Sequence, residues 1–535
     1  MERDGVEYNE PSLAKHRKFR VITHISHPQN SNYFCAVVIS HLLRRIYKKA
    51  AYICSNKAMA TKISHVRATP LYGGRSETGV CTLLEVGGVR ILLDCGGSLL
   101  GLSQEETKYS QKLASDLVAA GGVDAILLSH ADLHHVGLLP ILAGVKGLQK
   151  VPIIASFPVM KFAQLVLYDY LSNLEMEGEN ESGRKLAPYS FDDIDHAFQH
   201  TIKVKYSQKI AVPETRFVNP QDRSKRLPVF VTAISAGRTI GGSIWRIQCG
   251  PAEIVYCVDA NLRKEVVLDG VNMDLLPSAP VLMITDASCA SRSTLGSMAK
   301  KKRDKDDMQV LLQTVMTTVR SGGNVLIPVE SSARIQELLL AFAKYWSDNK
   351  LGMYHLIFLS HMSRNVMEYS SMLLEWMSDT LTRPFYNGKA NPMELPQVKC
   401  VTEMKTLDKI LLGPKVVFAT DASLNVGLGK EVLLRWGGDP RCKIIFTEVS
   451  DKDSLAYLLR TATVPIIATV NKVSNVELSG QELVDYKVEM DKKRRLEEEE
   501  NFRKKRQLEL SQVRNTWFLL FFVCSFVYLV TVACV

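Results

Sequence analysis

The 535-residue chain lacks paired cysteines. Its 11 cysteines are scattered singly, with no C-x-x-C pair and no dense spacing. This absence excludes a disulfide framework and is typical of reduced thiols in a cytosolic or nuclear protein. Cys95 and Cys257 lie in or beside apolar strand-like runs, so we expect both to be small buried residues.

A nucleotide-phosphate motif and a strong charge excess are also missing. Gly322-Gly323-Asn324 lacks the pattern G-x-x-x-x-G-K-[ST], so we interpret it as a turn that enters a strand. The net charge of +10 permits a nucleic-acid partner without indicating one. The basic residues Lys300, Lys301, Lys302 and Arg303 are weak candidates for RNA-phosphate contacts. Because no aromatic residues are interleaved with them, we expect a solvated loop there.

The two ends of the chain differ from the rest. Residues 1–58 have no signal-peptide layout and no strand or helix rhythm that continues beyond residue 58. We interpret them as an atypical, non-native extension, with an organelle-targeting segment as the alternative. Trp517–Val535 carries no charge and comes after a basic flank, which predicts a possible C-terminal transmembrane helix. The alternative is that this segment is untranslated sequence that has been read as protein.

Two regions alternate strand-like and helix-like patterns, as α/β domains do. Strands of the first region are expected at Val80–Glu85, Val89–Asp94, Ala125–Ser129, Val229–Ala233, Ser243–Gln248 and Ile254–Asp259. After Asp286, strands near Val325, His355, Lys415 and Lys443 with helices between them predict a second, mostly parallel sheet. From Val484 the sequence becomes highly charged, which favours a solvated helix or a linker.

The loop after Ala125–Ser129 presents four ligand-capable side chains within six residues: His130, Asp132, His134 and His135. Two-metal hydrolysis needs such a loop, together with a bridging carboxylate, because the two cations lie about 3.5–4 Å apart. Neutral imidazole and carboxylate are suitable zinc ligands. Three aspartates end predicted strands and can contribute to a site of this kind: Asp94, Asp259 and Asp286.

Five motifs in order carry a resemblance to a known family. They are Ile91–Gly96, His130–His135, Ala236–Gly242, Val255–Asp259 and Ile284–Asp286. From about Met59 to Gly480 the chain resembles the metallo-β-lactamase/β-CASP family of RNA and DNA processing nucleases. The resemblance implies an αββα sandwich over residues 59–287 with an inserted β-CASP α/β domain over 288–483. A charged linker is expected at 484–516, and the fold is expected to be truncated at its C-terminus.

The departures from the family pattern argue against a working zinc site. The third motif of the family has a zinc-ligating histidine where this chain has Arg238, and a guanidinium has no lone pair to donate. Asp132 and His134 stand where active relatives have histidine and aspartate, although both can still ligate. No histidine occurs after His361, so the late histidine motifs have no candidates.

We therefore predict a degenerate site in which Arg238 fills the metal cavity and pairs with Asp132 and Asp259. A polar structural core without this pairing is the alternative. No cofactor or metal is expected. If a metal binds after all, the candidate ligands are His130, Asp132, His134, His135 and Asp259.

The resemblance extends to a non-catalytic branch of the family. It is carried by Ser129-His130-x-Asp132-x-x-His135, by Gly241-Gly242-Ser243-Ile244-Trp245 and by Glu375-Trp376-Met377-Ser378. It implies a nuclear pseudo-enzyme that acts as a scaffold in pre-mRNA 3′-end cleavage and polyadenylation. The implied partners are the active endonuclease homologue, as a heterodimer, other subunits of that complex, and pre-mRNA. The alternatives are a divergent zinc-dependent RNA hydrolase and a membrane-tethered paralogue.

Overall fold

A computed structural model describes most of the chain. The described residues are 12–23, 66–74, 79–97, 104–177, 187–213, 227–286, 300–332, 334–410, 413–448, 451–462 and 466–477, with separate positions between 480 and 506. The chain forms two compact units, residues 18–470 and the two terminal segments 1–17 and 471–535.

The terminal regions contain little described structure. Within the N-terminal extension lies a strand, β1 (Ser12–Thr23), which pairs with β18 (Ile466–Glu477) in a two-stranded sheet. The described positions between 480 and 506 are mostly helical and exposed, as expected of a solvated charged segment. Among the described residues, none of the helices has the length and apolarity needed to cross a membrane. The predicted span at 517–535 lies outside the described residues.

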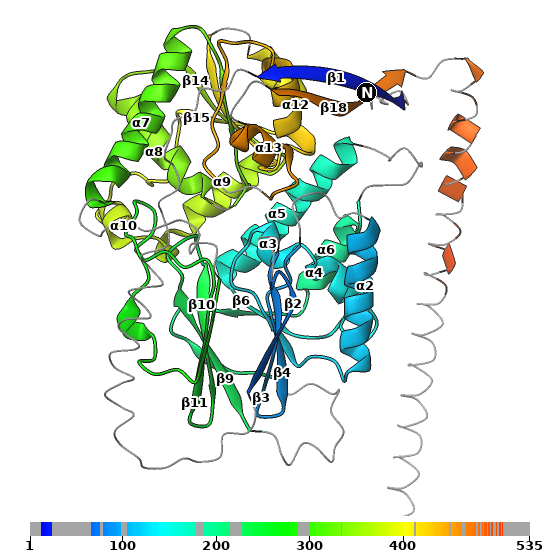
Figure 1. Cartoon of the computed structure of the whole chain (residues 1–535), viewed down its shortest axis with the longest axis vertical. Coiled ribbons are helices and arrows are strands. Elements are labelled where there is room, and N and C mark those ends of the chain that lie inside the picture. The colour runs from blue at the N-terminus through cyan, green and yellow to red at the C-terminus, as the bar shows by residue number, and fades with distance from the viewer. Residues whose placement is uncertain are drawn as a thin grey trace, which may run out of the picture. The chain divides into compact units, whose positions relative to one another are not determined.

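Two sheets packed face to face form the first domain, residues 66–286 (Figure 1). The first sheet has the order β2-β3-β4-β5-β6-β7, and strands β4 to β7 are parallel. Its strands are β2 (Arg67–Tyr72), β3 (Cys81–Val86), β4 (Val89–Leu93), β5 (Ala125–Leu127), β6 (Ile153–Ser156) and β7 (Thr201–Val204). Strands β3 and β4 form a hairpin, and Gly87 and Gly88 supply the positive φ angles, 58° and 79°, that its tight turn requires.

The second sheet has the order β12-β11-β10-β9-β8. Its strands are β8 (Lys209–Ala211), β9 (Val229–Ser235), β10 (Ser243–Cys249), β11 (Ala252–Cys257) and β12 (Leu282–Thr285). Alternate side chains of both sheets meet in one core, where Trp245, Tyr256, Leu84 and Ile91 are fully buried. The burial expected for Cys95 and Cys257 is confirmed.

Helices cover the outer face of the first sheet. They are α2 (Gln104–Ala119), α3 (Leu133–Val136), α4 (Leu139–Gly144), α5 (Phe157–Met176) and α6 (Phe191–Phe198). On the outer face of the second sheet, apolar side chains of residues 260–276, including the 3₁₀ turn η2 (Met273–Leu275), pack against β9, β10 and β11. The expected αββα layering is thus built with an irregular segment over part of its second sheet.

The second domain, residues 300–462, contains a fully parallel sheet of order β15-β14-β16-β13-β17. Its strands are β13 (Val325–Pro328), β14 (His355–Leu359), β15 (Val398–Val401), β16 (Lys415–Ala419) and β17 (Lys443–Ile444). Its helices are α7 (Lys300–Arg320), α8 (Ile335–Asp348), α9 (Ser363–Met372), η3 (Leu374–Trp376), α10 (Asp379–Tyr386), α11 (Met404–Lys409), α12 (Gly427–Trp436) and α13 (Leu455–Thr461). The central strands are buried on both faces, as the continuous apolar runs predict.

The prediction of a loop at Lys300–Arg303 is wrong. These residues form the first turn of α7, and the helix continues without interruption to Arg320. Lysine and arginine have high helix propensity, and the run contains neither glycine nor proline, so the basic composition favoured the helix itself.

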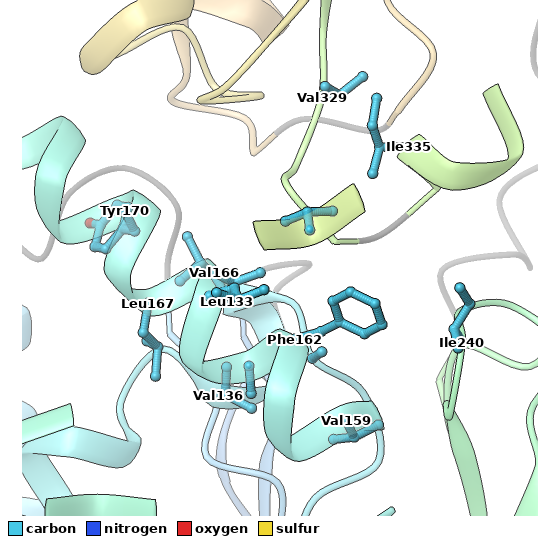
Figure 2. Close-up of a cluster of buried hydrophobic side chains, with 14 of the residues drawn as sticks. Leu133, Val136, Val159, Phe162, Val166, Leu167, Tyr170, Ile240, Val329 and Ile335 are labelled. Carbon is cyan, nitrogen blue, oxygen red and sulfur yellow. The ribbon is translucent and has the colours of Figure 1, made fainter. Parts of the chain in front are cut away.

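Helix α5 is shared by the two domains. Figure 2 shows Val159, Phe162 and Val166 of α5 in one hydrophobic cluster with Val329 and Ile335 of the second domain. The two domains therefore share one buried core along α5.

Polar side chains extend this contact at spacings of four residues along α5. Asp169 accepts a hydrogen bond from Ser360 Oγ at 2.7 Å, and Asn173 Oδ1 accepts one from Leu428 N at 3.2 Å. One turn further, Glu177 binds Lys430 Nζ at 2.6 Å. Residues four apart lie on one face of a helix, so this face of α5 holds the second domain in a fixed position.

Candidate functional site

Asp94 ties together the strand ends beneath the candidate site. It comes directly after β4 with a positive φ of 57° and is completely buried. Its carboxylate accepts hydrogen bonds from Ser129 N at 2.7 Å, Ser129 Oγ at 2.6 Å and Tyr256 OH at 2.6 Å. Burial raises its pKa despite these donors. Asp94 therefore links β4, the loop after β5, and β11.

The histidine loop lies directly against the backbone just after Asp94. The carbonyl oxygen of His134 accepts from Val80 N at 2.7 Å, and that of His135 accepts from Cys95 N at 2.8 Å. A Cβ on Gly96 would lie 1.6 Å from the carbonyl oxygen of His134. Glycine is therefore required at this position for the loop to approach so closely.

His130 is completely buried and neutral. Its Nδ1 lies 3.0 Å from Ser129 Oγ, whereas its Nε2 is buried without a hydrogen-bond partner. Burial, together with neighbouring His135, lowers the pKa of His130 to about 3. A Cβ on Gly242 would come within 3.0 Å of this Nε2, so the glycine of the third motif makes room for the ring.

Asp132 and His135 form a buried pair. The distance from His135 Nδ1 to Asp132 Oδ1 is 2.6 Å, within the single turn of α3 that Asp132 begins. Burial alone would lower the pKa of His135, but Asp132 beside it raises that pKa to about 10. In turn, burial would raise the pKa of Asp132, but the charge on His135 lowers it. The pair is therefore imidazolium and carboxylate at neutral pH.

Arg238 and Asp259 form the second pair of the cluster. Arg238 Nη1 lies 3.5 Å from Asp259 Oδ1, and the Arg238 side chain is 33% exposed. Asp259 lies just after β11 with a φ of 47°, and its backbone N–H donates to Asp286 Oδ2 at 2.7 Å. The carboxylate of Asp259 raises the pKa of Arg238 further. Asp286 thus orients the turn that carries Asp259.

The two pairs lie next to each other. His135 Nε2 is 3.9 Å from Asp259 Oδ2, and the rings of His130 and His135 are 4.9 Å apart between centroids. Asp132, which we expected to bind Arg238 directly, is hydrogen-bonded to His135 instead and influences Arg238 through its charge. The arrangement contains two carboxylates and two cationic groups.

His134 points away from this cluster. Its Nδ1 accepts a hydrogen bond from Gly79 N at 3.2 Å, and its Nε2 lies 4.0 Å from Asp451 Oδ1 of the second domain. Among the described residues, the ligand atoms that come within 4.8 Å of one another belong to Asp132, His135 and Asp259. Of the five predicted metal candidates, three therefore meet in one group.

Two glutamates of the second domain were missed by sequence reasoning. Glu330 lies just after β13 and is buried, and burial with the nearby carboxylate of Asp132 raises its pKa well above the ordinary value. Burial also raises the pKa of Glu448 to about 7. The one available signal was the position of Glu330 just beyond a predicted strand, where side chains reach the edge of a sheet.

The binuclear zinc site that the resemblance implies does not fit this donor set. Arg238 places a permanent positive charge 3.5 Å from Asp259, one of the candidate ligands. Asp132 Oδ1 lies 2.6 Å from His135 Nδ1, and against the effect of burial this carboxylate raises the pKa of the imidazole, which opposes the deprotonation that ligation through Nε2 requires. Two of the groups needed as ligands are thus already neutralised by side chains of the protein.

Two family models match the chain. The metallo-β-lactamase superfamily domain matches residues 83–287, and the Beta-Casp domain matches residues 335–459. The chain is 33% identical over 432 residues to cleavage and polyadenylation specificity factor subunit 2 of Arabidopsis thaliana, covering 81% of this chain and 54% of that protein. It is 32% identical over 431 residues to the probable subunit 2 of Drosophila melanogaster, covering 79% and 52%.

A fungal relative is more distant. Cleavage factor two protein 2 of Schizosaccharomyces pombe is 28% identical over 318 residues, covering 58% of this chain and 36% of that protein. The chain spans about half the length of the plant and insect relatives. With two packed sheets succeeded by a parallel α/β domain, and with both family models matched in that order, the chain belongs to the metallo-β-lactamase superfamily, among its members that carry a β-CASP domain.

Proposed function

We propose that the chain is a non-catalytic scaffold subunit of a nuclear complex for pre-mRNA 3′-end cleavage and polyadenylation. In this role it pairs with the active endonuclease homologue of the same family and contributes to RNA binding. The names of the plant and insect relatives support membership of such a complex. The degenerate site supports a scaffold role rather than a catalytic one.

The observation that carries this proposal is the ion pair between Arg238 and Asp259. A unit charge 4 Å from another contributes about 4 kcal/mol at an effective dielectric constant of 20, and the repulsion is about twice as large for a divalent cation. A metal bound at Asp259 would meet this repulsion and would lose the ion pair as well. Arg238 thereby neutralises the charge of Asp259, which a metal cation would neutralise in an active member of the family.

The pairing of Asp132 with His135 also disfavours metal binding. To ligate a metal through Nε2, His135 would have to release the proton of that nitrogen, while Nδ1, 2.6 Å from Asp132 Oδ1, keeps its own. Burial lowers the pKa of His135, but Asp132 raises it by more, which opposes this release. Metal binding would therefore remove the charge of His135 and would compete with Arg238 for Asp259.

A divergent zinc-dependent RNA hydrolase is the second candidate function. It is favoured by the proximity of Asp132, His135 and Asp259, and by the buried Nε2 of His130, which has no hydrogen-bond partner. These residues would hold the metal. Zinc would supply a Lewis acid and an activated water.

Elemental analysis of the purified full-length chain distinguishes the scaffold from the zinc-dependent hydrolase. We expect well below one zinc per chain for the wild type and for Arg238→Lys, which keeps the positive charge. Arg238→His should bind more zinc than either, because it removes the charge and adds a neutral imidazole. About one or two zinc ions per wild-type chain would overturn the proposal, as would RNA cleavage with added zinc or manganese that His135→Ala abolishes.

A further inference from the structure

A cavity of about 280 Å³ lies between α5, α6 and β7, on elements that do not contribute to the histidine cluster. Its polar lining comes from Lys161 and Gln164 of α5, Asp195 of α6, and Gln199, Thr201 and Lys203 at and before β7. Gln199 and Lys203 are exposed, so the cavity opens to solvent.

Two ammonium groups at this cavity are not used in ion pairs. Lys161 Nζ lies 5.7 Å from the ring centroid of Tyr369, and Lys203 Nζ lies 5.6 Å from that of Phe157. Within the described part of the chain, neither lysine forms a salt bridge. The one carboxylate of the lining, Asp195, accepts a hydrogen bond from Tyr168 OH. The formal charge of the lining is therefore positive, and its lysines remain available to an anion.

Two of the remaining lining groups suit an oxyanion, because the amides of Gln164 and Gln199 each offer two N–H donors. The hydroxyl of Thr201 adds no donor, since its proton goes to the carbonyl of Phe198 at 2.9 Å. Lysine ammonium groups and side-chain amides are typical donors to phosphate oxygens. The aromatic rings near the lysines are partly buried and contact their ammonium groups, so they do not form an open platform for base stacking.

The basic character continues just beyond β7. Lys205 follows the last residue of β7 and lies two residues after Lys203, about 6.6 Å along an extended chain. Lys205 Nζ is 3.6 Å from Glu375, but both side chains are mostly exposed, so this pair is weak and can exchange with an external anion.

From this arrangement we infer that the cavity binds a backbone phosphate of a single-stranded RNA that runs along β7. This inference rests on the proposed function for the choice of RNA, whereas the anion site derives from the cavity and its lysines. Because phosphate contacts carry no base information, the binding should be insensitive to sequence and sensitive to salt.

The test measures RNA affinity of the full-length chain by fluorescence anisotropy with a labelled single-stranded oligonucleotide, over a series of salt concentrations. Lys161→Gln/Lys203→Gln should bind about tenfold more weakly at low salt. The slope of log affinity against log salt should fall by about 0.7 for one lost phosphate contact. Lys161→Arg/Lys203→Arg should bind as the wild type does.

Lys146→Gln/Lys344→Gln is the matched control, because it removes two exposed lysines elsewhere on the chain. The inference is overturned if this control loses as much affinity as the cavity variant, or if the wild type binds no RNA at low salt. It is also overturned if the cavity variant loses affinity for inorganic phosphate but not for RNA, since the cavity would then be a site for small anions only. Co-purification with the active homologue, measured on the same variants, reports separately on the proposed function.

Discussion

The cluster around His135 and the cavity around Lys161 both gather charged side chains, but only the cluster neutralises its charges internally. In the cluster, Asp132 binds His135 at 2.6 Å, and Arg238 lies 3.5 Å from Asp259. In the cavity, the ammonium groups of Lys161 and Lys203 lie over aromatic rings and face solvent without a carboxylate partner among the described residues. The charges of the cluster are therefore already neutralised, whereas those of the cavity could bind an external anion.

Burial explains the difference. Asp132 and His135 are 6% and 2% exposed, so an unpaired charge on either would be strongly disfavoured. Lys203 is exposed, and water solvates its charge at little cost. In the function we propose, the side chain of Arg238 neutralises Asp259 at the buried site.

The largest expected effect comes from breaking the buried pair. His135→Ala removes the cation beside Asp132 and should lower the free energy of unfolding by about 3 kcal/mol, because a carboxylate would remain buried without its partner. Urea unfolding monitored by tryptophan fluorescence measures this change, since Trp245 is fully buried between the two sheets.

A double-mutant cycle identifies the cause. Asp132→Asn combined with His135→Ala should cost less than the sum of the two single variants, by about 1 kcal/mol or more. Additive losses would mean that the two side chains stabilise the fold independently. His196→Ala, at an exposed histidine of α6, is the control and should change stability by less than about 0.5 kcal/mol.

The pH dependence of stability tests the same pair in a second way. The pKa of His135 is raised from 6.5 to about 10, so the folded state holds a proton that the unfolded state releases. Its contribution is complete below pH 6.5 and is lost as the pH rises toward 10. The free energy of unfolding should therefore fall as the pH rises through this window.

The measurement compares wild type with His135→Gln in the presence of a chelator, because other groups also titrate at alkaline pH. The difference in unfolding free energy between the two should decrease from pH 6.5 to 10. Asp132 acts at the opposite end, since its lowered pKa stabilises the fold above pH 3.8 and this contribution is lost on acidification. A constant difference between pH 6.5 and 10 would show that His135 is neutral in the folded protein.

The sequence predicted the first-domain part of the cluster well. Strand ends place Asp94, Asp259 and the histidine loop at one edge of the sheets, and Arg238 of the third motif lies 3.5 Å from Asp259. These positions could be predicted because each depends on a residue type at the end of a local element. The predicted pairing of Arg238 with Asp132 was wrong, since Asp132 binds His135, and a side chain with several nearby acids pairs with one of them only in three dimensions.

Contributions from the second domain could not be predicted in the same way. Glu330 and Glu448 approach the cluster, and Asp451 approaches His134, because α5 holds the second domain against the first through contacts far apart in sequence. The direction of His134 could not be predicted either, because hydrogen bonds from Val80 N to its carbonyl and from Gly79 N to its ring Nδ1 set its orientation. Contacts between residues far apart in sequence therefore determine the parts of the site that the local sequence pattern does not predict.

The smallest expected effect is on stability at the cavity. Lys161→Gln/Lys203→Gln should change the free energy of unfolding by less than about 1 kcal/mol, because exposed cation–π contacts contribute little and repulsion between the two ammonium groups is removed. Urea unfolding in parallel with His135→Ala measures the contrast. A loss above about 2 kcal/mol would mean that the lysines support the fold. In that case the cavity would resemble the cluster, and its charges would not be free for a ligand.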